Sequence, residues 1–328
     1  MDGAILIILG VALVATALIE AFLTMLGMRG GGPITNAWSR AAWRVALAAH
    51  RRRPIHTVLS LAGPTFMVGA VLSWYVLLVA GWLLIFGGSV PAVVVSETGA
   101  PATIGERLSF VGSTVSLVGY GDLAPSGLSW TMVAAGSAFT GTFLLTLSLS
   151  YLMPVISAAL QRRQLAQDVS AIGDSPIALV RESWTGHNPG LLNVYWADTL
   201  RDLNRHAHQH LVYPVLHYFH SGREDQSHAV ATLRLADALF LISQTTGPER
   251  PPDGLLQLWR GAMRRYAEMK GVGPPDDEEE LETPDHLSRS AIERLGLEPV
   301  DEERFQKALD EYAPLRRRLV TLLRDDGW

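Results

Sequence analysis

The chain has 328 residues, enough for about two domains, and its formal net charge of −5 gives no support to a general nucleic-acid partner. It contains no Cys, which excludes disulfides, thiolate metal sites and a Cys nucleophile. Hydrophobic residues are concentrated before Arg162, and the rest of the chain is charged and mostly polar. The sequence therefore predicts a membrane part followed by a soluble part.

Three apolar stretches are each long enough to cross a bilayer, which takes about 20 helical residues. We expect the first helix over 4–26, interrupted only by Glu20, the second over 64–86 and the third over 128–160. The stretches around the second and third helices contain no Asp, Glu, Lys or Arg. Because the third helix exceeds a bilayer span, its end should tilt strongly or project into the cytoplasm.

Loop charges predict the orientation of these spans. The loop between the first two spans is rich in Arg and has no acid, so the positive-inside rule places it in the cytoplasm. The N-terminus and the loop before the third span would then lie outside, and the chain after Arg162 would lie inside. A cleaved signal peptide is the competing interpretation of the first stretch, but that stretch lacks a basic n-region and is long. The basic loop residues are Arg29, Arg40, Arg44, Arg51, Arg52 and Arg53.

Residues 35–53 predict an amphipathic helix within this loop. One face carries Trp38, Ala42, Val45 and Ala49, and the other carries Arg40, Arg44 and Arg51, with Leu47 as an exception on the basic face. Such a helix can lie in the cytoplasmic interface just before the second span. The alternative, which we weigh equally, is an ordinary loop helix whose Arg residues only set the topology.

The segment from Pro101 to Asp122 connects the second and third spans. Thr103, followed three residues later by Glu106, predicts a capping box at the start of a short helix that runs through Val115. This helix is too short to cross the membrane, so we expect the segment to re-enter on the same side. Non-helical backbone at membrane depth is tolerated only inside protein or along a watery path.

The strand Val118-Gly119-Tyr120-Gly121 follows this helix. Successive backbone carbonyls can replace the hydration shell of an ion if all of them turn inward, which needs unusual dihedrals at alternate residues. Gly119 and Gly121 accept such dihedrals without steric cost. Tyr120 would point away from the axis, and Asp122 at the outer mouth would attract cations. The short helix would direct its partly negative C-terminal end toward the central cavity.

This arrangement resembles the potassium-channel pore family, which has an outer helix, a pore helix, a Thr-Val-Gly-Tyr-Gly filter and an inner helix. The resemblance covers about 64–160. It implies potassium as the permeant ion, no other cofactor, and a homotetramer in a lipid bilayer, because four strands enclose the ion and the chain has one. The implied K⁺-coordinating backbone is that of Leu117, Val118, Gly119, Tyr120 and Gly121, with Asp122 at the mouth. The implied pore-helix support comes from Thr103, Glu106, Phe110 and Ser116.

Leu117 departs from the family pattern, which usually has Thr at this position. The Thr carbonyl and hydroxyl both line the innermost ion site, whereas Leu offers only its carbonyl. The Ser116 side chain should point toward the pore-helix packing instead. We therefore expect a weaker innermost site, with altered conductance or selectivity.

The third span contains three residues that can shape a gate. The family resemblance places a gating hinge at Gly141, and Pro154 can kink the helix near the cytoplasmic mouth. For Gly136 we favour close helix packing, which is also the alternative for Gly141. No span has Arg at every third position, so a voltage sensor is not expected. A Gly-x-Gly-x-x-Gly segment after a strand is also missing, so the nucleotide-binding regulatory domain common in this family is not evident.

The region after Gln161 has a helical pattern with Pro and Gly punctuation. The predicted helices span 176–184, 191–210, 214–220, 227–244, 254–269, 286–295 and 302–324. The acidic, Pro-rich run 271–285 predicts an exposed linker. The last helix has an apolar stripe that is typical of a core surface: Phe305, Leu309, Tyr312, Leu315, Leu319 and Leu322.

Six His residues lie unusually close together in this region: His206, His208, His210, His217, His220 and His228. His206 and His210, at i and i+4, can share a helix face and hold a metal or change charge near neutral pH. The favoured alternative is satisfied polar groups around Pro214. As a hypothesis, the cluster tunes pore opening by protons or zinc.

We therefore expect an all-α membrane protein with three transmembrane helices, a re-entrant pore loop and a helical cytoplasmic domain. Its expected parts are a first span (1–28), a basic segment (29–60), a pore domain (61–160) and a cytoplasmic domain (161–328). The expected function is a potassium-selective channel and not an enzyme. The alternatives are a non-conducting sensor or scaffold with channel architecture and, less favoured, a membrane-bound enzyme that uses the His-rich region.

Overall fold

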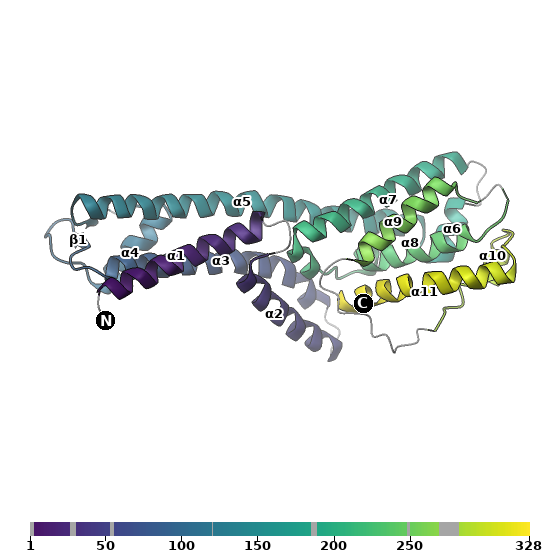
Figure 1. Cartoon of the computed structure of the whole chain (residues 1–328), viewed down its shortest axis with the longest axis horizontal. Helices are drawn as coiled ribbons and strands as arrows, with labels where there is room; N and C mark the ends of the chain where they lie inside the picture. Colours follow the sequence, from purple (N-terminus) through teal and green to yellow (C-terminus); the bar gives the residue numbers. More distant parts are fainter. Residues whose placement is uncertain are drawn as a thin grey trace. The chain divides into compact units, whose positions relative to one another are not determined.

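The computed structural model describes residues 3–26, 31–52, 56–119, 121–184, 189–247, 250–268 and 282–328. Its helices are α1 (Gly3–Leu26), α2 (Pro33–Arg52), α3 (His56–Gly87), α4 (Ile104–Val115), α5 (Gly127–Ile172), α6 (Pro176–Trp184), α7 (Pro189–Val212), α8 (His228–Ser243), α9 (Asp253–Ala267), α10 (Arg289–Arg294) and α11 (Glu302–Asp325), shown in Figure 1. Two 3₁₀ helices, η1 (Pro214–Tyr218) and η2 (Glu224–Gln226), and two short strands complete the described elements. The predicted all-α fold class is confirmed.

Three helices are long and apolar enough to cross a membrane: α1, α3 and α5. Two of them exceed their predicted bounds. α3 begins at His56 and runs through Pro64, so Pro64 does not mark its start. α5 continues to Ile172, well past the expected end at 160. The extension is supported by packing, because Leu165, Ala166 and Val169 are buried in the core of the C-terminal helices.

The chain divides into two compact units, one of residues 1–41 and 64–155 and the other of residues 42–63 and 156–328. The second half of α2 and the first turns of α3 therefore belong with the C-terminal helices. Nothing in the sequence pattern marks this grouping, because residues 42–63 continue helices that begin or end in the other unit.

In the first unit, α1 lies against α3 through paired glycines (Figure 1). A Cβ on Gly10 would lie 2.5 Å from the Gly81 carbonyl oxygen, and one on Gly81 would lie 2.8 Å from that of Gly10. Gly3 and Gly88 approach one another in the same way. Small residues allow such close backbone contact between apolar helices, where van der Waals packing is a main source of association.

Glu20, the one charged residue of α1, caps the start of α2. Its side chain is 2% exposed, and its Oε1 accepts a hydrogen bond of 2.6 Å from the Ile34 amide. The Thr35 hydroxyl donates to the other carboxylate oxygen, and Thr24 Oγ1 accepts from the Gly32 amide. The carboxylate thus satisfies a first-turn N–H that has no partner within its own helix.

The predicted apolar face of α2 is only partly covered within the chain, and its contact with a membrane interface remains a prediction. Val45 is 71% exposed and Ala49 is also exposed, whereas Trp43 and Leu47 are buried. Trp43 is buried because its ring contacts Tyr218, with ring centroids 5.6 Å apart. The Leu that appeared to be an exception on the basic face therefore belongs to the buried face, because a tertiary contact decides which side is covered.

The second unit has one hydrophobic core, built mainly by α7, α8, α9 and α11. Ring contacts organise its centre: Phe240 stacks on Tyr312 at 4.7 Å, and Trp259 lies 6.1 Å from the same ring. Ser227 caps α8 and Asp301 caps α11. The stripe predicted for the last helix is confirmed as core, with Phe305, Tyr312, Leu319 and Leu322 buried and the other two residues packed against them.

Other boundaries in this unit differ where local chemistry intervenes. α6 has its predicted bounds, but residues 214–218 form a 3₁₀ turn, and α10 begins only after its N-cap Ser288. Residues 271–281 of the predicted acidic linker lie outside the described residues, and the remaining part, 282–285, has no helix or strand.

Candidate functional site

The short helix α4 begins with the predicted capping box. The Thr103 amide donates to Glu106 Oε2 at 2.7 Å, and the Glu106 amide donates back to Thr103 Oγ1 at 3.4 Å. These hydrogen bonds lower the pKa of Glu106 below its usual value. Phe110 anchors the helix: it is buried and meets Phe86 of α3 edge-on, with ring centroids 5.4 Å apart.

The backbone after α4 turns its amides back onto that helix. The amides of Val118 and Gly119 donate to the Ser113 carbonyl at 2.9 and 3.3 Å, and the Leu117 amide donates to Thr114. Within the described ranges, no donor reaches the carbonyls of Leu117, Val118 or Gly119. Backbone carbonyls are strong acceptors that normally find partners, so three consecutive open ones form a row of available acceptors.

Two residues of this row have positive φ: Leu117 at 61° and Gly119 at 64°. The positive φ was predicted at Gly119, whereas at Leu117 it was not. At Leu117 this conformation costs about 1–2 kcal/mol, because the residue has a Cβ. The φ of Gly121, also expected to be unusual, is a torsion that includes Tyr120 and so falls outside the described residues. Tyr120, expected to point away from the axis, lies outside the described residues.

A small antiparallel sheet, absent from our predictions, holds the segment that follows the row. It pairs β1 (Val93–Val95) with β2 (Leu123–Pro125). Ser96 extends it: its amide donates to the Asp122 carbonyl at 2.9 Å and its hydroxyl to the Gly121 carbonyl at 2.7 Å. This hydrogen bonding explains why Gly121 does not continue the row of open carbonyls. The Asp122 side chain is exposed, as a mouth residue would be.

Ser116 and the α5 residues Gly136 and Gly141 differ in their surroundings. The Ser116 hydroxyl donates to the Gly112 carbonyl at 2.7 Å and so closes the end of α4. A Cβ on Gly141 would lie 2.0 Å from the Val115 carbonyl oxygen, whereas one on Gly136 would meet only Trp82, at 3.8 Å. The close-packing role favoured for Gly136 therefore belongs to Gly141. A hinge at Gly141 and a kink at Pro154, which lies inside α5, remain predictions.

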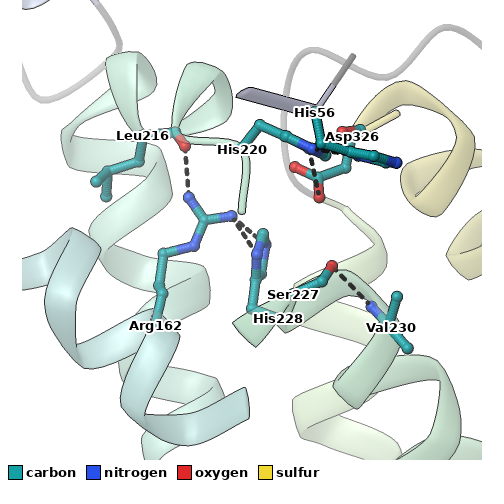
Figure 2. A network of polar contacts seen from close by, with 8 residues as sticks. All are labelled: His56, Arg162, Leu216, His220, Ser227, His228, Val230 and Asp326. Atoms are coloured by element: carbon teal, nitrogen blue, oxygen red, sulfur yellow. Dashed lines mark hydrogen bonds and ion pairs between the residues drawn. The ribbon is translucent and has the colours of Figure 1, made fainter. Parts of the chain in front are cut away.

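A buried polar network joins the end of α5 to the C-terminal helices (Figure 2). Arg162, 5% exposed, donates to the Leu216 carbonyl at 2.5 Å and to a ring nitrogen of His228. Next to it, His220 contacts His56 with a nitrogen–nitrogen distance of 3.0 Å, and its other ring nitrogen lies 2.6 Å from the Asp326 carbonyl oxygen. His56 is a member that our prediction missed, because only the fold brings α3 beside η1.

The predicted pair His206 and His210 lies on α7, and a metal site at this pair remains a prediction. Both are buried, and His206 Nδ1 lies 2.9 Å from Gln209 Oε1. Outside the undescribed segments, no group of three or more His, Cys, Asp or Glu side chains is placed to hold a metal ion. The His cluster is divided instead: His210 lies near His217, with ring centroids 6.0 Å apart, and His208 is exposed.

We expect acid to destabilise the C-terminal helices. Burial lowers the pKa of His217 to about 4 and places that of His228 well below its usual value. The unfolded chain takes up protons near pH 6.5 and the folded one does not, so the free energy of unfolding falls from pH 6.5 towards pH 4. His217 alone accounts for up to about 3 kcal/mol. Nearby Arg162 lowers the pKa of His217 further, and Asp326 raises it.

Thermal unfolding of the detergent-solubilised chain between pH 4.5 and 7.5 measures this dependence. His217→Gln should make the profile less steep, with the contribution of His228 remaining, and the exposed His208→Gln should leave it unchanged. A profile that is flat in the unaltered chain would contradict the expectation.

The fold and its three apolar helices define an all-α membrane protein. A protein of Bacillus subtilis (strain 168) described as "Uncharacterized membrane protein YdjJ" is 26% identical over 322 residues, which cover 97% of this chain and 92% of that protein. No family model and no solved structure matches the chain.

Proposed function

We propose that the chain is one subunit of a potassium-selective channel. The main observation in support is the row of carbonyls at Leu117, Val118 and Gly119. The amides of these three residues donate to α4, and their carbonyl oxygens have no donor among the residues that the structure describes. Carbonyl oxygens that replace the hydration shell are how a filter passes potassium. With the amides fixed, the oxygens keep their positions when an ion arrives.

Electrostatics favour a cation along this path. The filter row begins at the C-terminal end of α4, where the helix dipole carries a partial negative charge. The exposed carboxylate of Asp122 stands at the other end. Both charges attract a cation, and neither requires a side chain to touch it.

A homotetramer completes the proposal, because one strand cannot surround an ion. α5 carries an apolar stripe that is exposed in the single chain and follows a helical spacing: Leu128, Met132, Phe139, Phe143, Leu149, Met153, Ile156 and Leu160. Such a stripe suits contact with further copies and with lipid. In this proposal the N-terminus lies outside, the C-terminal helices are cytoplasmic, and the chain does not act as an enzyme.

The alternative is a sensor or scaffold that keeps the channel architecture without conducting. Leu117 favours it, because this residue removes the hydroxyl of the innermost site and adds an exposed apolar side chain, 54% accessible, to the row. Ion flux separates the two proposals.

The deciding experiment is potassium flux into liposomes that contain the purified full chain, with sodium as the competing ion. We expect selective potassium flux that Gly119→Asp abolishes, because the side chain cannot keep φ near 64° without strain and occupies the ion path. Gly254→Asp on α9, where a side chain meets nothing within 4 Å, is the matched control and should conduct. No flux between pH 5 and 8, with or without calcium or voltage, would favour the sensor.

Leu117→Thr is expected to strengthen the innermost ion site several-fold, because it adds a hydroxyl ligand to the carbonyl. The potassium-to-sodium flux ratio and the ion occupancy of that site in crystals measure the effect. Leu117→Val is the matched control, since it has the branching of Thr without the hydroxyl. Equal occupancy in the Thr and Val variants would refute the expectation.

A further inference from the structure

A pocket of about 500 Å³ lies among α8, α9 and α11, in the unit that holds the C-terminal helices. This volume is in the range of sites that take a small organic molecule. The proposed conduction path lies on other elements and makes no use of this pocket.

Flat rings form part of its wall. Phe240, Trp259 and Tyr312 line the pocket and are themselves buried. Their mutual contacts fix their planes: Phe240 and Tyr312 are stacked with an interplanar angle of 11°. Tyr312 is held further by its hydroxyl, which donates to Asp237 at 2.7 Å. Because these side chains are buried and fixed, they give the pocket a rigid apolar base against which a flat ligand can pack.

Three guanidinium groups, those of Arg260, Arg264 and Arg318, also line the pocket, and all three residues are exposed. In the part of the chain that the structure describes, none of them forms an ion pair or a side-chain hydrogen bond. Other Arg residues of the same helices are engaged: Arg265 donates to Asn204, and Arg316 pairs with Asp237. Unengaged Arg at the edge of a pocket is typical of carboxylate or phosphate recognition.

Two carboxylates limit the charge of the ligand. Glu268 and Glu311 line the same pocket, so the titratable lining carries three positive and two negative groups. A polyanion would meet both acids, whereas a ligand with one anionic group can be bound by Arg and remain apart from them.

We propose that this pocket binds a small acid that joins a flat ring to a single carboxylate or phosphate group. The ring packs against the apolar base of the pocket, and the anionic group pairs with Arg264 and Arg318. Because conduction plays no part in this binding, the proposed site can be tested independently of the proposed channel.

Isothermal titration of the full chain in detergent tests the proposal with matched probes. AMP and indole-3-acetate each join a ring to one anionic group, adenosine and indole are their neutral counterparts, and inorganic phosphate has no ring. We expect at least one of the two acids to bind about ten-fold or more tightly than its neutral counterpart, and AMP to exceed phosphate if the phosphate is the preferred group. ATP should bind more weakly than AMP because of the two Glu residues.

Arg264→Gln and Arg318→Gln should each weaken the binding of that acid about ten-fold, whereas Arg265→Gln, on the same helix and outside the pocket, should not. Circular dichroism confirms that the variants fold. The proposal is overturned if neither acid binds, if the neutral counterparts or phosphate alone bind as well, or if the two pocket variants bind like Arg265→Gln.

Discussion

Gly141→Ala is expected to destabilise the first unit and to abolish potassium flux. The added Cβ would lie 2.0 Å from the Val115 carbonyl oxygen, so α4 and α5 must move apart. Overpacking of this kind costs about 1–3 kcal/mol, and here the displaced atom is backbone at the start of the filter row. The Tyr75 hydroxyl, which donates to the Gly141 carbonyl at 3.2 Å, would move with it. Thermal unfolding in detergent and liposome flux measure the two effects.

Gly136→Ala is the matched control on the same helix, because its Cβ meets only Trp82, at an ordinary 3.8 Å. It should unfold and conduct like the unaltered chain. If Gly141 acts as a hinge without a packing role, Gly141→Ala would change channel opening and leave thermal stability intact, which would contradict the packing interpretation.

Asp237→Asn is expected to cost the C-terminal helices about 3–5 kcal/mol, because it removes the buried carboxylate of an ion pair and leaves the partly buried Arg316 without its counter-charge. Asp237 is 1% exposed and binds three partners from α11 and the segment before α10. Tyr312 Oη donates to it at 2.7 Å, Arg316 Nε at 3.1 Å and His286 Nε2 lies at 2.9 Å. Hydrogen exchange of the full chain should show lost protection in α8 and α11.

Two further variants provide smaller reference effects on stability with which the Asp237→Asn effect can be compared. Tyr312→Phe removes one hydrogen bond and should cost about 1 kcal/mol. Asp198→Asn removes a carboxylate that pairs with Arg201 on the exposed surface of α7, and its effect should stay below about 1 kcal/mol. An Asp237→Asn effect no larger than that of Asp198→Asn would show that the buried contacts are not stabilising.

Local chemistry in the sequence was enough to predict the helices, the start of α4 and the positive φ of Gly119. The three apolar stretches, the Thr103–Glu106 capping box and the stripe of α11 depend on spacing within one segment, so they can be predicted without knowledge of distant contacts. The need for positive φ near Gly119 follows from the glycine itself. Bounds were less certain, because α3 and α5 extend beyond their most apolar parts.

Only the tertiary structure determined the features that depend on contacts between segments distant in the chain. Leu117 adopts a strained φ because the Val118 and Gly119 amides bind back to Ser113, and no residue preference indicates this. Gly141 and Gly136 look alike in the sequence, but only Gly141 faces Val115. The same reason explains the buried face of α2 and the place of His56 beside His220, since burial and hydrogen bonding are properties of pairs of segments.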